Sequence, residues 1–165
     1  GLGLSSFLSE SVVNGGFPLW LLPVVVFLIS CLISFSTGTS WGTFAIMIPI
    51  IMPIAVALGK ASGYTGSELL NTTLVPIGAV LGGAIFGDHS SPISDTTILS
   101  STGASCPHLE HVATQVPYAV FIAAVALIGH IVAGITLSAA AALIASSAVF
   151  TAGIFLLPRL LKGTE

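Results

Sequence analysis

Two long apolar runs lie in the first part of the chain, and a short polar segment separates them. The first extends from Leu19 to Phe35 and the second from Trp41 to Leu58, with Ser36 to Ser40 between them. Each run falls slightly short of the roughly 20 residues that a spanning helix needs. Residues 18–58 therefore predict either two spanning helices with a tight turn or a re-entrant helical hairpin. We favour the hairpin, because the uncharged tip suits irregular backbone that is buried in protein at membrane depth.

The third apolar run is too short to cross a membrane alone, and a polar segment, Gly87 to Thr97, follows it. Pro92 lacks a backbone N–H and disfavours a helical conformation at the residue before it. The helix is therefore predicted to open between Gly87 and Ser94 and to resume from Asp95. Residues 69–101 are expected to form one discontinuous transmembrane helix.

Glycines within this third run occur in two pairs with small-xxx-small spacing. Gly78 pairs with Gly82, and Gly83 pairs with Gly87. Small residues at this spacing let the backbone of another helix come close. A neighbouring helix is expected to pack tightly here.

The last part of the chain is almost continuously apolar. A loop is predicted from Thr102 to Leu109, and residues 110–157 are predicted to form two transmembrane helices that join near Gly134. Residues 1–165 then make a single all-α membrane domain. Its parts are a re-entrant hairpin, a discontinuous helix and two spanning helices.

Composition places this domain in the lipid bilayer. Hydrophobic residues make up 55% of the chain and charged residues only 5%, against about 25% charged residues in soluble domains. Three basic and six acidic side chains cannot cover the surface of a protein of this size in water. The chain carries no basic patch, which argues against a nucleic-acid partner. No organic cofactor and no metal beyond a monovalent cation is expected.

Two aspartates in the polar segment are the best candidates for function. A carboxylate at the centre of a bilayer costs roughly 2.5–3.5 kcal/mol on insertion scales. Hard cations such as sodium prefer oxygen ligands, which broken helices supply in many transporters. Burial favours the protonated form of a carboxylate and a bound cation favours the ionised form, so a proton and a sodium ion can compete for Asp88 and Asp95. The alternative is that both aspartates cap the half-helices. The hydroxyl side chains of the segment are those of Ser90, Ser91, Ser94, Thr96 and Thr97.

Histidines offer a second kind of chemistry. His89 is a candidate proton relay, since histidine changes charge near neutral pH; alternatively it is a neutral side chain bonded to a nearby carbonyl. His108 and His111 have a spacing that can bind metal, although we favour a solvated or capping cluster at a helix start. A membrane metalloenzyme would use Asp88, His89, His108 and His111. Gln115 lies in the first turns of the same helix and is expected to neighbour the site.

A serine-hydrolase motif is present but lies in the wrong context. Gly38 to Gly42 matches G-x-S-x-G, which requires a strand before the serine and a helix after it. Here the motif lies between two apolar helical runs. Catalysis by Ser40 with His130 is therefore discounted, and His130 is expected to make an interhelical contact.

The assembled residues resemble the NhaC family of sodium/proton antiporters. The likeness lies in Ser36 to Phe44 and in Phe86 to Ser101, and continues through His108, His111, Thr114, Gln115, Pro117 and Tyr118. It implies a multi-pass antiporter of the prokaryotic inner (cell) membrane, built from inverted repeats, and not an enzyme. It also implies that this chain is the C-terminal half of a transporter whose partner is its own N-terminal half. Association with further copies stays open.

We therefore expect exchange of sodium for protons. The alternative is a sodium-coupled antiporter for carboxylates of the malate and lactate type, although no arginine or lysine lies near either polar segment. The hairpin tip is expected to complete the ion site. The predicted site residues are Asp88, Asp95, Ser91, Ser94, Thr97, Thr37, Thr39 and Ser40.

Overall fold

The chain folds entirely into helices over the residues that the structure, a computed structural model, describes. It describes the backbone of residues 4–162 and the side chains of residues 7–155. The elements are α1 (Leu4–Asn14), the 3-10 helix η1 (Leu19–Leu21), α2 (Leu22–Thr37), α3 (Ser40–Ala61), α4 (Gly66–Ser90), α5 (Asp95–Gly103), α6 (His108–Thr136) and α7 (Ala139–Lys162). Four stretches are long and apolar enough to cross a membrane, namely Leu19–Thr37, Ser40–Ala61, Gly66–Ser90 and His108–Thr136. The prediction of an all-helical membrane protein is confirmed.

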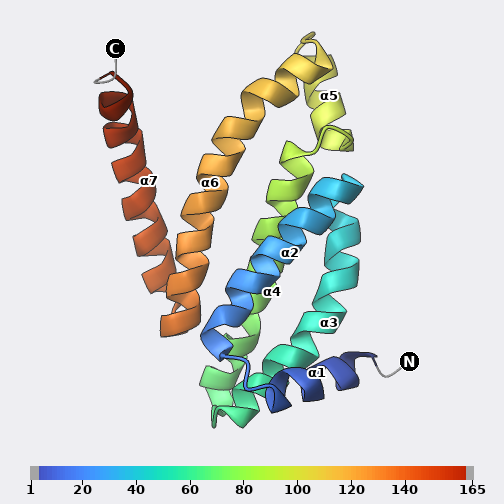
Figure 1. Cartoon of the computed structure of the whole chain (residues 1–165), viewed down its shortest axis with the longest axis vertical. Helices are drawn as coiled ribbons and strands as arrows, with labels where there is room; N and C mark the ends of the chain where they lie inside the picture. The colour runs from blue at the N-terminus through green and yellow to red at the C-terminus, as the bar shows by residue number, and fades with distance from the viewer. Residues whose placement is uncertain (1–3, 163–165) are drawn as a thin grey trace.

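Helices α2 and α3 form an antiparallel pair with a very short turn. Gly38 ends α2 with a φ of 70°, in the left-handed region that favours glycine. Thr39 then caps α3, because its hydroxyl oxygen accepts a hydrogen bond from the N–H of Gly42 at 3.3 Å. The turn lies beside the break between α4 and α5 (Figure 1).

Helix α4 packs against α2 at very short range. A Cβ atom on Gly87 would lie 2.5 Å from the backbone nitrogen of Phe35 and 2.6 Å from the carbonyl oxygen of Cys31. A Cβ atom on Gly83 would collide with the carbonyl oxygen of Phe27. The second glycine pair thus lets the two backbones touch, whereas a Cβ atom on Gly78 would meet nothing within 4 Å.

The helix breaks within the predicted stretch but over fewer residues, and it resumes at Asp95 as predicted. Helix α4 continues to Ser90, so Asp88 lies in its last turn and only residues 91–94 separate it from α5. The reason is that a proline removes one hydrogen bond only, the bond to the carbonyl four residues earlier. The N–H of Ser91 still reaches the carbonyl of Gly87 at 2.9 Å.

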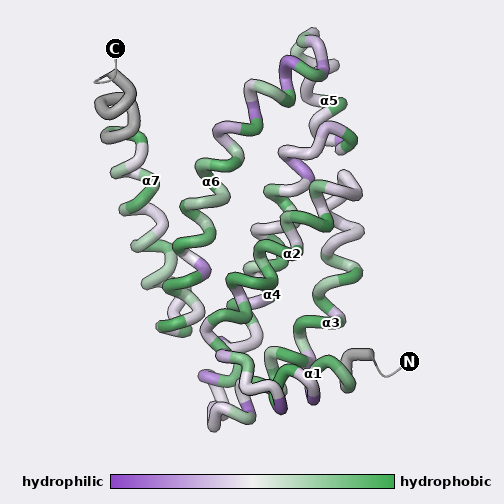
Figure 2. The backbone as a smooth tube through the Cα atoms, in the orientation of Figure 1, coloured by the Kyte–Doolittle hydropathy of each residue, from purple (hydrophilic) through white to green (hydrophobic). Residues whose placement is uncertain are grey.

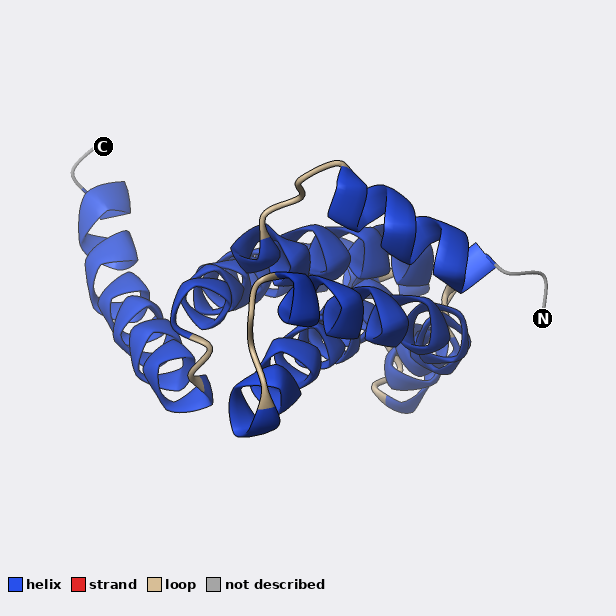
Figure 3. Ribbon diagram, turned by 90° about the horizontal axis from the view of Figure 1, so that it is seen from below, coloured by secondary structure: helices blue, strands red, loops and turns tan. Residues whose placement is uncertain are grey.

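Helices α6 and α7 form the second antiparallel pair. Leu137, with a φ of 52°, ends α6, and the hydroxyl of Ser138 accepts from the N–H of Ala141 at 3.3 Å. The join therefore lies slightly beyond the predicted position near Gly134. Seen from below, α1 and α7 lie on opposite sides of the other helices (Figure 3).

Hydropathy along the backbone shows where polar residues gather (Figure 2). Hydrophilic residues gather near α1 and at the start of α6, and most of α2 and α6 is hydrophobic (Figure 2). The backbone also turns from green to white and purple where α4 gives way to α5 (Figure 2). That break, facing the turn between α2 and α3, is where a functional site is to be sought.

Candidate functional site at the helix break

Asp88 is a buried carboxylate with no cationic partner. Its side chain is only 8% exposed, and it forms no ion pair within the side chains of residues 7–155. A buried charge is normally paired or ligates an ion, because removing it from water is costly. Within the described residues, no cationic side chain therefore balances the charge of an ionised Asp88 carboxylate.

Three hydroxyl groups converge on this carboxylate. Ser40 Oγ donates to Asp88 Oδ2 at 2.8 Å, and Ser94 Oγ donates to Oδ1. Thr96 Oγ1 lies 3.5 Å from Oδ1 and 2.8 Å from Ser94 Oγ. Both carboxylate oxygens thus have hydroxyl partners, and the hydrogen-bond partners of Asp88 are all oxygen atoms.

These hydroxyls reach Asp88 because four helix ends meet there. Ser40 is the first residue of α3, and Ser94 caps the N-terminus of α5, accepting from the N–H of Thr96 at 3.2 Å. Gly38, at the C-terminus of α2, packs against the backbone of Ile93. The positive ends of two helices face the negative ends of two others, so the carboxylate remains the main uncompensated charge.

The break also frees main-chain carbonyls, and polar side chains bond to them. Pro92 has no N–H to give to the carbonyl of Asp88, and Thr97 Oγ1 lies 3.4 Å from that oxygen. Thr97 Oγ1 also lies 3.3 Å from the carbonyl oxygen of His89, which accepts from Gln115 Nε2 at 2.8 Å. Helix α6 is thereby tied to the end of α4.

His108, at the start of α6, forms hydrogen bonds to both the break and α5. Its Nε2 lies 2.6 Å from the carbonyl oxygen of Pro92, and its Nδ1 lies 3.1 Å from Ser101 Oγ. One imidazole therefore joins the start of α6 both to the broken segment and to α5. This contact sets the position of α5, at whose start Ser94 and Thr96 lie.

Replacement of His108 by leucine is expected to destabilise the full-length protein by about 1–3 kcal/mol, because the carbonyl of Pro92 loses its partner. Thermal unfolding in detergent measures the effect. The matched control is His111→Leu on the same helix, since His111 Nε2 is buried without a hydrogen-bond partner among the described residues. Equal unfolding temperatures for the two variants would contradict a stabilising role for the hydrogen bonds of His108.

The other predicted residues lie around this centre without touching the carboxylate. Asp95 is exposed at the start of α5 and makes no side-chain hydrogen bond to the described residues. Thr37 is exposed and donates to the carbonyl of Ile33 in its own helix at 2.8 Å. Ser91 is buried, and its hydroxyl oxygen accepts from the N–H of Ile93 at 3.4 Å. His89 is exposed.

Thr96 is absent from the site predicted from the sequence, although its hydroxyl lies in the polar segment. Its position two residues after the cap Ser94 was the available signal, since a hydroxyl in the first turn of a half-helix lies close to that cap. Gln115 was expected only as a neighbour, and it bonds to the break itself. Among the described residues, no three His, Cys, Asp or Glu side chains converge as metal ligands would, so the metalloenzyme alternative gains no support.

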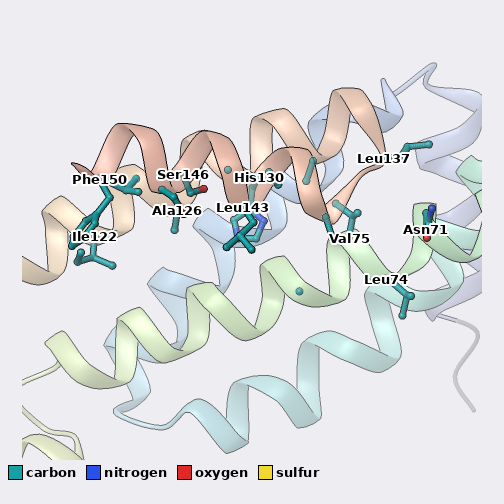
Figure 4. Close-up of a pocket in the computed structure, with 17 residues that line it drawn as sticks. Asn71, Leu74, Val75, Ile122, Ala126, His130, Leu137, Leu143, Ser146 and Phe150 are labelled. Atoms are coloured by element: carbon teal, nitrogen blue, oxygen red, sulfur yellow. The ribbon is translucent and has the colours of Figure 1, made fainter. Parts of the chain in front are cut away.

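A larger cavity lies away from this centre. It has a volume of about 600 Å³ between α4, α6 and α7 and is lined mainly by apolar side chains. Its polar lining includes Asn71, His130 and Ser146, but no carboxylate (Figure 4). His130 packs against Phe27 of α2 with ring centroids 5.0 Å apart, which is an interhelical contact. Without a charged group, this cavity is not a candidate ion site.

The fold and the site together define a multi-pass helical membrane protein with a buried carboxylate at a helix break. The profile of the Na⁺/H⁺ antiporter family matches residues 2–135. The chain belongs to that family.

Three relatives carry related sequences. An uncharacterized protein of Haemophilus influenzae is 47% identical over 88% of this chain and 26% of its own length. An uncharacterized Na⁺/H⁺ antiporter of the same organism is 34% identical over 54% of this chain and 17% of its own length. The malate-2H⁺/Na⁺-lactate antiporter of Bacillus subtilis is 40% identical over 52% of this chain and 16% of its own length.

The chain thus spans about a quarter of the length of the first of these relatives. No solved structure matches the chain.

Proposed function

We propose that this chain forms part of a secondary transporter that exchanges sodium ions for protons, with Asp88 as the group that binds either one. The observation that carries the proposal is a buried carboxylate surrounded by hydroxyls and without a cationic side chain. A sodium ion finds negative charge and oxygen ligands there, and a proton neutralises the same charge. Membership of the antiporter family supports this function.

Ser40 and Ser94 are proposed as hydroxyl ligands beside Asp88, because both already contact its carboxylate oxygens. Thr97 and Ser91 hold the broken backbone, and Thr39 holds the turn of the hairpin. Thr37 and Asp95 lie at exposed positions, and the charge of Asp95 is proposed to contribute only weakly to ion binding because solvent screens it. His89 is proposed to pass protons to the site from its exposed position.

The wider architecture is also a proposal. The turn between α2 and α3 contacts the α4–α5 break, which supports a re-entrant hairpin whose tip meets a discontinuous helix. Such pairs occur in transporters made of inverted repeats. We propose an NhaC-type protein of the inner membrane in which the N-terminal half supplies the facing repeat.

A sodium-coupled carboxylate antiporter is the second candidate. One relative is named as a malate-2H⁺/Na⁺-lactate antiporter, and that name concerns a protein of which this chain covers 16%. An organic acid needs hydrogen-bond donors, and the hydroxyls of Ser40, Ser94 and Thr96 can provide them. The absence of a cationic side chain bonded to this site among the described residues favours a cation as the main cargo.

Proton flux in vesicles that contain the full-length transporter tests both candidates. An inward sodium gradient is expected to drive protons out, and a trapped pH dye reports the alkaline shift. Flux that requires added malate or lactate would establish the carboxylate antiporter instead. If neither sodium nor these acids moves protons, the proposed function is wrong.

A further inference from the structure

A small polar hollow lies at the helix break, between the end of α4, the start of α5 and the first turns of α6. Its volume is about 40 Å³, and all the side chains that line it are polar: His89, Thr96, Thr97, Ser100 and Gln115. A site needs roughly 10–15 Å³ to hold one water. The hollow therefore has room for one small ion with little hydration, or for very few waters.

Two of the lining residues carry side-chain oxygen atoms that make no hydrogen bond within the described part of the chain. Gln115 Oε1 is buried and has no hydrogen-bond partner among the described residues. The orientation of its amide is set by the bond from Nε2 to the carbonyl of His89 at 2.8 Å. The hydroxyl of Ser100 also makes no hydrogen bond within the described part of the chain. A buried acceptor without a donor costs free energy. This points to a bound ligand that supplies a positive charge or a hydrogen-bond donor.

The electrostatics of the hollow favour a cation over an anion. The hollow lies where α4 ends, and the carbonyl of His89, freed by the break, meets two of its lining residues, Thr97 and Gln115. The C-terminus of α4 carries partial negative charge and the N-terminus of α5, which supplies Thr96 and Thr97, carries partial positive charge. Because these two oppose each other, the nearby carboxylate of Asp88 decides the sign. Thr96 lines the hollow and its Oγ1 also lies 3.5 Å from Asp88 Oδ1, so this residue links the hollow to the carboxylate.

We propose that this hollow is a second cation position, for a monovalent ion held by neutral oxygens beside Asp88. The proposal rests on the proposed function, since the ion is the sodium that the transporter moves. Neutral ligands suit a single positive charge, whereas divalent cations are usually held by several carboxylates. The affinity for sodium then depends on α5 and α6 as well as on the carboxylate.

Ser100 provides the sharpest test, because it lines the hollow and its hydroxyl makes no hydrogen bond to the described residues. In the full-length protein, Ser100→Asp is expected to lower the sodium concentration for half-maximal exchange about three- to tenfold, since it adds negative charge at the ion. Ser100→Ala is expected to raise that concentration about twofold or more through loss of a ligand. Opposite shifts from one position cannot both come from damage to the fold.

Thr102 supplies the matched control on the same helix. It is exposed, does not line the hollow, and donates to the carbonyl of Ile98 at 2.8 Å. Thr102→Asp is expected to leave the sodium dependence nearly unchanged. An equal shift in Thr102→Asp and Ser100→Asp would mean a general surface-charge effect, and the second position would be rejected.

Equilibrium binding of radioactive sodium to purified protein separates failure of this inference from failure of the proposed function. If the Ser100 variants bind sodium as the unmodified protein does, the hollow holds water only and the inference is wrong. If the Asp88→Asn variant exchanges sodium for protons normally, the proposed function is wrong. Weaker sodium binding in Ser100→Ala with Asp88 intact would support the second position directly.

Discussion

Replacement of Asp88 by asparagine is expected to reduce sodium-driven proton exchange of the full-length transporter by more than about tenfold. The amide keeps the volume of the carboxylate and one oxygen that can accept from the hydroxyl of Ser40 or of Ser94, but it carries no charge and exchanges no proton. Hydrogen bonds to charged groups contribute about 1.5–3 kcal/mol, and about 1.4 kcal/mol is already a factor of ten. Initial rates of proton flux against sodium concentration in reconstituted vesicles measure the effect.

Asp95→Asn is the matched control for this prediction. It makes the same chemical change seven positions away, on a side chain that is exposed and makes no hydrogen bond to the described residues. Its exchange rate is expected to stay within about twofold of the unmodified rate, because an exposed charge is largely solvated. Equal losses in both variants, or full activity in Asp88→Asn, would contradict the role given to Asp88.

Substitution of alanine for Gly83 or Gly87 is expected to destabilise the protein by about 1–3 kcal/mol or more, because each added methyl group meets the backbone of α2. At Gly83 the obstacle is the carbonyl of Phe27, and at Gly87 it includes the backbone nitrogen of Phe35. Backbone atoms cannot move away by a change of rotamer as a flexible side chain can, so α2 and α4 must separate. Thermal unfolding of the full-length protein in detergent measures the loss.

Gly78→Ala provides the control on the same helix. A Cβ atom there meets nothing within 4 Å, and alanine favours a helix by about 1 kcal/mol over glycine. This variant is expected to be as stable as the unmodified protein or slightly more so. If Gly83→Ala were equally stable, the two helices could not approach as closely as the structure has them.

The Gly87 substitution also tests the link between packing and transport. Gly87 precedes Asp88, so a displaced α4 carries the carboxylate away from Ser40 on α3. Gly87→Ala is therefore expected to lose exchange activity in addition to stability, whereas Gly78→Ala is expected to retain both. Proton flux in vesicles and thermal unfolding in detergent, carried out on both variants, measure the two effects.

Much of the site could be predicted because its signals are local. Pro92 marks a helix break within a few residues, since its ring removes one hydrogen bond at a known position. Asp88 is conspicuous because charge is scarce in the chain. The contact of Thr96 with the carboxylate and the short length of the break could not be predicted. The first depends on the hydrogen bonds around Ser94, and the second on the hydrogen bonds that the last turn of α4 keeps up to Ser90. Those hydrogen bonds depend on the folded geometry, which residue types and their spacing do not specify.

The sequence by itself determined the membrane class, the helical content and the presence of an ionisable group in an apolar setting. Those properties follow from apolar run length, scarcity of charge and the covalent nature of proline, which act over a few residues. Only the tertiary structure decided that Ser40 bonds to Asp88, 48 residues further along the chain. It also decided that the Gly83–Gly87 pair, rather than Gly78, meets α2. Both depend on how closely two helices pack, and that distance is set by contacts between segments remote in sequence.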